Sequence, residues 1–337
     1  MKQVTDKNDI TSNVGAARKF TINANAELID TLSNKLYKHP IRAIIRELVS
    51  NAIDANIAKG VQEPIKLHLP TRTEPEFYVE DFGIGMDEDT IYNVYTQYGN
   101  STKNNSNDQI GGLGLGSKTP FAYTTQFMVE SGTGKVRKTY TAFKDEDNYP
   151  QMTPPLAEIE SDKTGTKVAF AVDVSDIDTF YRESVITLLF AQQMPEIVGG
   201  GLSTFLSNAD CESVEEFNSL REIVKTDMII TNLKVCNIIK ESSYSGTMFV
   251  EMGGVLYSVD MDQLLDGDRY SGVLRFYSNY DYHGSRYFIL HLPIGSVNIQ
   301  ASREALNYSK HTKNVLNQAV ISKIVDTVKN ITEQIAA

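Results

Sequence analysis

Apolar residues recur at helical spacing in one stretch early in the chain. Between Ile41 and Ala58 they stand three or four positions apart, which places them on one face of a helix. The members of this face are Ile44, Ile45, Leu48, Ala52 and Ile53. Pro40 precedes the pattern and Gly60 follows it, as residues that begin and end helices do. The pattern therefore predicts a helix over 41–58.

Three polar residues lie on the opposite side of this predicted helix. Glu47, Asn51 and Asp54 stand at positions i, i+4 and i+7, and so fall within roughly 60° of one another around the axis. Two carboxylates and an amide on adjacent turns can serve a metal-bound phosphate and a water. The same stripe also suits an ordinary solvated helix face, so the rest of the chain has to decide between these two interpretations.

Shorter apolar or alternating runs predict strands, and further helical patterns predict helices. The predicted strands lie at 14–22, 65–69, 77–80, 228–239, 247–259, 273–277 and 287–292, with strand-and-turn patterning over 125–174. The predicted helices lie at 26–36, 88–95, 177–194, 214–224 and 313–334. Several strands packed on a few helices predict an α+β fold.

Composition narrows the classes of protein to consider. The net charge of −11 argues against a broad nucleic-acid or anionic-membrane footprint. Two cysteines make no disulfide framework, and the five histidines show no metal-site spacing. The first residues lack the apolar core of a signal peptide, and no apolar run is long enough to span a membrane. We expect a soluble, cytoplasmic protein with no strong nucleic-acid signal.

A second motif, DFGIGM, follows the predicted strand at 77–80. Asp81 stands at the strand end, where its carboxylate could accept a hydrogen bond from the exocyclic amine of adenine. Gly83 and Gly85 allow a sharp turn and the close approach of a flat ligand, and Met86 could pack on the ring. The alternative is a β-turn with a structural aspartate.

A third motif ends a stretch rich in Gly, Asn and Ser that runs from Gln97 to Gly112. Such loops are often lids or binding loops. Glycines at 111, 112, 114 and 116 lead into Ser117 and a predicted helix, so backbone N–H groups and the helix dipole could bind an anion. A flexible glycine hinge is the alternative. A Walker A loop is excluded because Ser117 separates Gly116 from Lys118.

The order and spacing of the three motifs resemble those of the GHKL ATPases. This superfamily includes DNA gyrase B, MutL, the ninety-kilodalton heat-shock chaperone and the sensor histidine kinases. The resemblance implies a Bergerat α/β sandwich that binds ATP and Mg²⁺. It makes Glu47 the general base, Asn51 the Mg²⁺ ligand and Asp81 the reader of adenine. It also implies nucleotide contacts from Asp54, Gly83, Gly85, Met86, Gly112, Leu113, Gly114, Leu115, Gly116, Ser117 and Thr166.

A second resemblance lies downstream in GSVNIQASREALNY, Gly295–Tyr308. It is similar to a segment in the chaperone's middle domain, in which an arginine reaches the terminal phosphate, and Arg303 would take that role. The alternative is a helix that starts at Ser302 and carries a surface Arg-Glu pair. The implied domains are a GHKL domain at 1–175, a transducer-like α/β domain at 176–312 and a C-terminal helix at 313–337.

Among GHKL proteins the whole pattern most resembles the rIIA-type proteins of tailed bacteriophages, which would place the protein in the host cytoplasm. Our first hypothesis is a slow, Mg²⁺-dependent ATPase whose lid closure and domain movement act on a protein partner. The second is a nucleotide-binding regulatory protein with negligible turnover. ATP-driven homodimerisation through residues 1–20 is a further hypothesis.

Two other roles within the superfamily fit less well. A histidine kinase needs a phospho-accepting histidine on a helix ahead of the ATP domain, and only His39, in a Lys-His-Pro turn, precedes Glu47. A topoisomerase is disfavoured by the acidic charge and by the lack of a domain with a tyrosine nucleophile.

Overall fold

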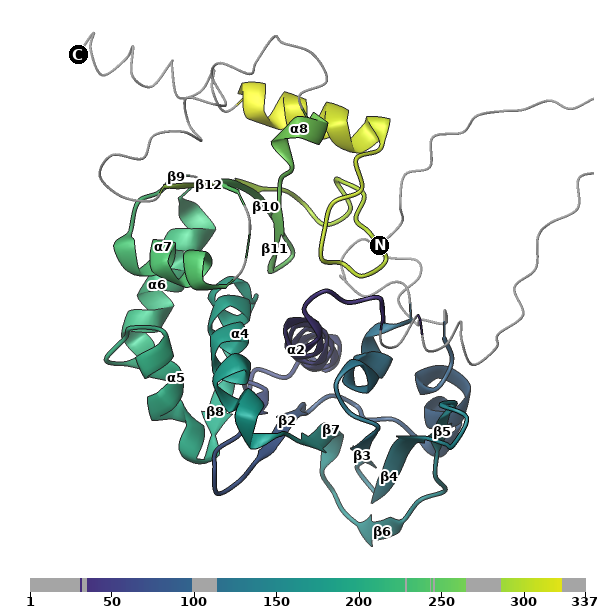
Figure 1. Cartoon of the computed structure of the whole chain (residues 1–337). Coiled ribbons are helices and arrows are strands. Elements are labelled where there is room, and N and C mark those ends of the chain that lie inside the picture. Colours follow the sequence, from purple (N-terminus) through teal and green to yellow (C-terminus); the bar gives the residue numbers. More distant parts are fainter. Residues whose placement is uncertain are drawn as a thin grey trace, which may run out of the picture.

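The helix α2 (Pro40–Lys59) lies between a large and a small β-sheet in the computed structural model of the chain (Figure 1). It confirms the helix predicted over 41–58, and the five apolar residues that define the pattern are all buried. Gly60 ends the helix with φ +78°, a left-handed conformation that glycine adopts without steric cost. The structure describes residues 31, 35–98, 114–227, 229–242, 244, 246–264 and 286–322.

The large sheet has the strand order β5-β4-β3-β7-β2-β1-β8, with β6 paired to β4 beside this path. All of its pairs are antiparallel except β1 with β8. Its strands are β1 (Lys66–His68), β2 (Glu76–Glu80), β3 (Gln126–Thr133), β4 (Val136–Lys144), β5 (Pro150–Met152), β6 (Ala157–Glu160), β7 (Thr164–Ala171) and β8 (Glu196–Val198). Along β2, Phe77 and Val79 are buried and their neighbours are not, because alternate side chains point to opposite faces. The alternation fixes which face of the sheet receives α2.

Helices lie on that face, beside α4, and beyond the small sheet, where α8 is found (Figure 1). They are α3 (Glu88–Thr90), the π-helix η2 (Ile91–Tyr95), the 3₁₀ helices η3 (Gly116–Ala122), η4 (Val174–Asp176) and η5 (Gly199–Gly201), and α4 (Ile177–Phe190), α5 (Leu202–Asn208), α6 (Val214–Thr226), α7 (Leu233–Glu241) and α8 (Met261–Leu264). Residues 310–322 are also helical. None of the helices in the described ranges is long and apolar enough to cross a membrane.

The small sheet has the order β11-β10-β12-β9. Its strands are β9 (Ile229–Ile230), β10 (Met248–Met252), β11 (Val255–Ser258) and β12 (Tyr287–His291). One face, with Phe249 and Ile289, joins the core that also contains α2 and α4. The other face, with Val250 and Leu290, packs on a second core that includes Leu316. The sheet is therefore covered on both sides.

One apolar core continues from the large sheet to the small sheet. It includes Ile44 of α2, Phe180 of α4, Phe217 of α6 and Phe249 of β10. β8 also extends the large sheet by pairing in parallel with β1. The division of the chain at residue 176 therefore remains a prediction, because elements from both sides of it share this core.

The predicted α+β class is confirmed, but one predicted element is wrong. The segment predicted as a strand over 228–239 is a strand only at β9, and it then forms the helix α7. Asn232 caps this helix by accepting a hydrogen bond from the Val235 backbone N–H, at 3.2 Å. The buried residues of α7 lie on one face of the helix. In so short an apolar run the helical period cannot be distinguished from that of a buried strand, and the prediction failed for this reason.

Other predictions fall partly or wholly outside the described residues. The strands at 14–22 and 273–277 and most of the helix at 26–36 lie there, and so does the C-terminal helix beyond residue 322. The alternative in which a helix starts at Ser302 is wrong, since residues 301–305 form turns and bends.

Candidate functional site

The helix α2 places Glu47 and Asn51 on one side, four residues and about one turn apart. Gly116, at the start of η3, lies directly against both side chains. A Cβ atom added to Gly116 would lie 2.5 Å from Glu47 Oε2 and 3.4 Å from Asn51 Nδ2. The end of the glycine-rich segment and the polar face of α2 therefore meet, as their predicted roles require.

Glu47 is buried, with an exposed fraction of 4%, and forms an ion pair with Arg303 from the far end of the chain. Arg303 Nη1 donates to both carboxylate oxygens, at 2.9 Å and 3.1 Å. The sequence neighbour of Glu47, Arg46, also approaches the carboxylate, with Nη2 at 3.3 Å from Oε1. Two guanidinium groups thus surround one carboxylate.

Opposing effects set the charge of this carboxylate. Burial raises the pKa of Glu47, and the positive charges of Arg303 and Arg46 lower it. The arginines prevail, so the pKa of Glu47 lies below its ordinary value and the group is ionised at neutral pH.

Asp81 stands at the end of β2, where one of its oxygens organises the following turn. Its Oδ1 accepts hydrogen bonds from the backbone N–H groups of Gly83, at 2.8 Å, and Thr166, at 3.2 Å. Among the described residues no hydrogen bond is formed by Oδ2. Burial raises the pKa of Asp81 to about 6, although the two N–H bonds act in the opposite direction. The carboxylate thus has one oxygen committed to the fold and one open to a ligand.

The rest of the DFGIGM turn is packed tightly against its neighbours. Gly85 has φ +75°, and a Cβ there would collide with the carbonyl oxygen of Gly132. Gly83 faces α2, where an added Cβ would lie 2.9 Å from Ala55 Cβ. The Met86 backbone N–H donates to Ser131 Oγ, at 2.7 Å, and its side chain lies against the core. The turn is therefore rigidly placed between α2 and the sheet.

Two residues of α2 that the motifs do not mark also hold this turn. Asn56 is fully buried, and its Oδ1 accepts from the Phe82 backbone N–H, at 2.8 Å. Lys59 Nζ donates to the Phe82 carbonyl, at 2.9 Å, and also contacts the Thr164 hydroxyl. Asn56 and Lys59 stand nine and twelve positions after Glu47, on other sides of the helix, so the sequence carries no signal for these roles.

The glycine-rich segment is described only from Gly114 onward, so Gly112 and Leu113 lie outside the described residues. Leu115 forms the N-cap of η3, and Ser117 donates weakly to the Tyr95 carbonyl, at 3.4 Å. Lys118 is buried, and its Nζ donates to the carbonyls of Gln97, at 2.7 Å, and Gly114, at 3.1 Å. Burial lowers the pKa of Lys118 to about 8. This lysine, to which the sequence motifs assign no role, joins the two described flanks of the segment.

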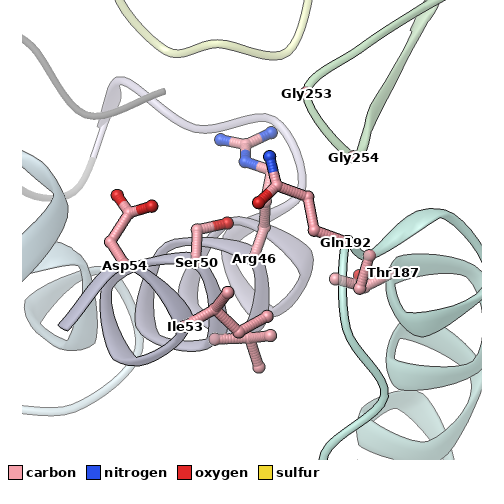
Figure 2. A pocket seen from close by; sticks show the side chains of 10 residues that line it. Arg46, Ser50, Ile53, Asp54, Thr187, Gln192, Gly253 and Gly254 are labelled. Carbon is pink, nitrogen blue, oxygen red and sulfur yellow. The ribbon is translucent and has the colours of Figure 1, made fainter. Parts of the chain in front are cut away.

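Asp54 lies apart from the contact between Glu47, Asn51 and Gly116. With Arg46 and Ser50 it lines a small cavity whose other side is the β10–β11 turn at Gly254 (Figure 2). Gln192, after α4, points into the same space. The structure thus gathers the predicted residues in two groups along α2, one at Glu47 and one at the DFGIGM turn, and places Asp54 toward the small sheet.

The donor set beside Asn51 fits a magnesium ion that is held mainly by a phosphate ligand. Mg²⁺ prefers oxygen ligands and often takes only one or two from the protein. The amide oxygen of Asn51 would be such a ligand, on a half-buried side chain beside Gly116. In the described parts of the chain no cluster of three or more His, Cys, Asp or Glu could hold a metal by itself.

Part of the chain matches a known protein family. Residues 37–167 match the family model described as "Histidine kinase-, DNA gyrase B-, and HSP90-like ATPase". No curated protein matches the chain, so the narrower resemblance to the bacteriophage rIIA-type proteins gains no support and stays a prediction. The large sheet with helices on one face is consistent with the α/β sandwich of the GHKL superfamily. The part of the chain from residue 37 to residue 167 is thus similar to the GHKL ATPases.

Proposed function

We propose that this chain binds ATP together with Mg²⁺ and hydrolyses it slowly. The family match over residues 37–167 supports ATP binding. The observation that carries the proposal is the contact of Gly116 with both Glu47 and Asn51, close to an arginine. A carboxylate, an amide and a guanidinium beside a glycine-rich turn are the groups that phosphoryl transfer requires.

In this proposal adenine binds at the DFGIGM turn. The free Oδ2 of Asp81 accepts a hydrogen bond from the exocyclic amine, while Oδ1 stays bonded to Gly83 and Thr166. The side chain of Met86 packs on the ring. The absence of side chains at Gly83 and Gly85 lets the turn pack closely against α2 and Gly132, and this packing fixes the backbone that the base would contact.

The triphosphate extends from there toward Asn51 and Gly116. Asn51 would hold the Mg²⁺ through its amide oxygen, and the ion would offset the negative charge of the phosphates. The backbone N–H groups at Gly114, Leu115 and Gly116, followed by η3, supply further donors to phosphate oxygens.

Hydrolysis uses Glu47 as the general base. Its carboxylate takes a proton from a water whose oxygen attacks the γ-phosphorus, and the bond from the γ-phosphorus to the bridging oxygen breaks to release ADP. Arg303 lowers the pKa of Glu47 and so weakens it as a base. We therefore propose that Arg303 transfers from Glu47 to the γ-phosphate, where it stabilises the developing charge.

The same transfer would carry nucleotide state to residues 176–312, which we propose as the transducer-like domain. Arg303 follows the small sheet in the chain, so its movement displaces that part of the molecule relative to α2. Closure of the segment from Gln97 to Gly116 over the phosphates completes the proposed cycle. A protein partner, or a second copy of the chain, would respond to this movement.

A second candidate is a nucleotide-binding regulatory protein with negligible turnover. The observation in its favour is that two arginines engage Glu47, which holds the carboxylate in its weakly basic state. The two candidates differ only in whether the ion pair opens when nucleotide binds.

Phosphate release by Glu47→Gln tests the proposal. Glutamine keeps the shape of the buried side chain and cannot act as a base, so we expect release to fall about 100-fold with nucleotide affinity retained. Glu63→Ala, an exposed glutamate just beyond α2, is the control and should behave as the wild type. Wild-type release by Glu47→Gln would refute the role of Glu47, and no release by the wild type would favour the regulatory candidate.

A further inference from the structure

The helix that carries Glu47 begins without a cap from its own sequence neighbours. His39 occupies the N-cap position, makes no side-chain bond to the helix, and is followed by a first turn that has no acidic residue. Helix N-termini leave backbone N–H groups without partners and carry a partial positive charge. Another part of the chain therefore has to supply the missing acceptor.

That acceptor is Glu304, more than 260 residues away. One carboxylate oxygen accepts from the Lys38 backbone N–H and the other from the His39 backbone N–H, both at 2.7 Å. Hydrogen bonds from backbone N–H groups to a carboxylate are short and stronger than neutral ones. Both oxygens of Glu304 are thus used to fix the chain where it leads into α2.

The turn that carries Glu304 also carries Arg303, in a conformation that needs support. Arg303 has φ +55°, the left-handed region that disfavours residues with a side chain. A bridge between Ile299 and Leu306 closes the loop around it. Arg46 donates to the carbonyls of Arg303, at 2.8 Å, and Ser302, at 3.1 Å.

We propose that Glu304 is the positioning residue that sets Arg303 against Glu47. The inference rests on the function proposed above and adds a residue that would contact neither the nucleotide nor the attacking water. Glu304 fastens the turn to the start of α2, and Arg303 meets the same helix two turns further along. Two attachments on one rigid helix fix the orientation of the turn, and Arg46 holds its backbone between them. Without Glu304, the strained Arg303 backbone relaxes and the guanidinium loses its place.

Hydrogen exchange tests the attachment without reference to turnover. In the wild type the Lys38 and His39 amides should exchange slowly, and in Glu304→Ala and Glu304→Gln they should exchange at least tenfold faster. Glu146→Gln, an exposed glutamate in the β4–β5 turn, is the control and should leave them unchanged. Unchanged protection in both Glu304 variants would overturn the proposal, and thermal melting identifies a variant that fails to fold.

Double variants test whether Glu304 acts through Arg303. We expect Glu304→Gln to lower phosphate release about tenfold with unchanged nucleotide affinity, and to lower it no further when Arg303 is already methionine. Independent losses that multiply in the double variant would overturn the positioning role. A wild type that binds no nucleotide would instead contradict the proposed function, while the exchange data would still report the attachment of Glu304.

Discussion

At the scale of single residues, the site depends on where carboxylates are buried and what surrounds them. Burial alone raises the pKa of a carboxyl group, as at Asp81, because the charged form loses its hydration. Glu47 is at least as deeply buried, and two guanidinium groups reverse the direction of its shift. The carboxylate of Glu47 is thereby kept ionised at neutral pH, and the pKa of Asp81 is raised to about 6.

The shift at Asp81 predicts that adenine binding weakens in mild acid. Its pKa is raised to about 6, so below that pH the carboxyl group becomes protonated and loses its capacity to accept from the adenine amine at full strength. Adenosine affinity should fall by up to about tenfold per pH unit below 6, because the ionised fraction falls in that proportion. Titration calorimetry with adenosine, which has no phosphate to titrate, measures this.

Asp81→Asn serves as the control for this pH dependence. It should bind adenosine weakly at every pH, because its side chain does not ionise. A wild-type affinity that stays constant from pH 7 to pH 5 would exclude Asp81 as the adenine acceptor.

The pair between Glu47 and Arg303 predicts a coupled effect on stability. Arg303→Met leaves a buried carboxylate with one guanidinium in place of two, and should lower the free energy of unfolding by about 3 kcal/mol. Glu47→Gln in the same chain should recover part of this loss, because no unpaired charge then remains. Urea unfolding of the two single variants and the double variant measures the coupling, and purely additive losses would show that the pair is not formed.

Local patterns predicted Glu47, Asn51 and Asp81 because each belongs to a motif that can be read over a few positions. Local patterns could not predict the roles of Arg46 and Glu304. The carbonyls to which Arg46 donates and the backbone N–H groups that Glu304 binds lie more than 250 residues away in the chain, and nothing in the local sequence distinguishes these two residues from surface charges.

At the scale of elements, the turn after β2 is held from two directions. Asn56 and Lys59 fix it from α2, and Ser131 and Thr166 fix it from β3 and β7. A turn held in this way presents its backbone to a flat ligand with little cost of reordering. Its glycines are then steric requirements and not sources of flexibility.

Gly85→Ala should therefore be much more damaging than Gly60→Ala. Both glycines have φ close to +75°, but a Cβ at Gly85 collides with the Gly132 carbonyl, whereas nothing lies within 4 Å of a Cβ at Gly60. The left-handed backbone alone costs about 1 kcal/mol at either position. The collision should add about 2 kcal/mol or more at Gly85, as overpacking does in cores. Equal losses in urea unfolding would contradict the tight packing of this turn.

Periodicity was reliable where an element is long or its two faces differ. It predicted α2 within one residue at each end, and it predicted β2 from its alternation. It failed at α7, whose nine residues are too few to separate a helical period from an apolar strand, although Asn232 supplies a cap.

At the scale of the whole molecule, α2 connects the two halves. One end of the helix is fastened by Glu304, its middle meets Gly116 and Arg303, and its last turn holds the DFGIGM turn through Lys59. A ligand that draws Arg303 away from Glu47 would loosen a contact between segments more than 250 residues apart. Light scattering with a bound ATP analogue would show whether this change also doubles the mass, as an ATP-driven dimer requires.

The most direct test of the account is whether the chain binds nucleotide at all. Wild type and Asp81→Asn are titrated with a non-hydrolysable ATP analogue and Mg²⁺ by calorimetry, at pH 7.5 or above so that Asp81 is ionised. We expect saturable one-to-one binding to the wild type, weakened at least tenfold in Asp81→Asn. Absence of binding to the folded wild type would contradict the proposal that the chain binds ATP. Equal affinities for the two proteins would contradict the role of Asp81 in that binding.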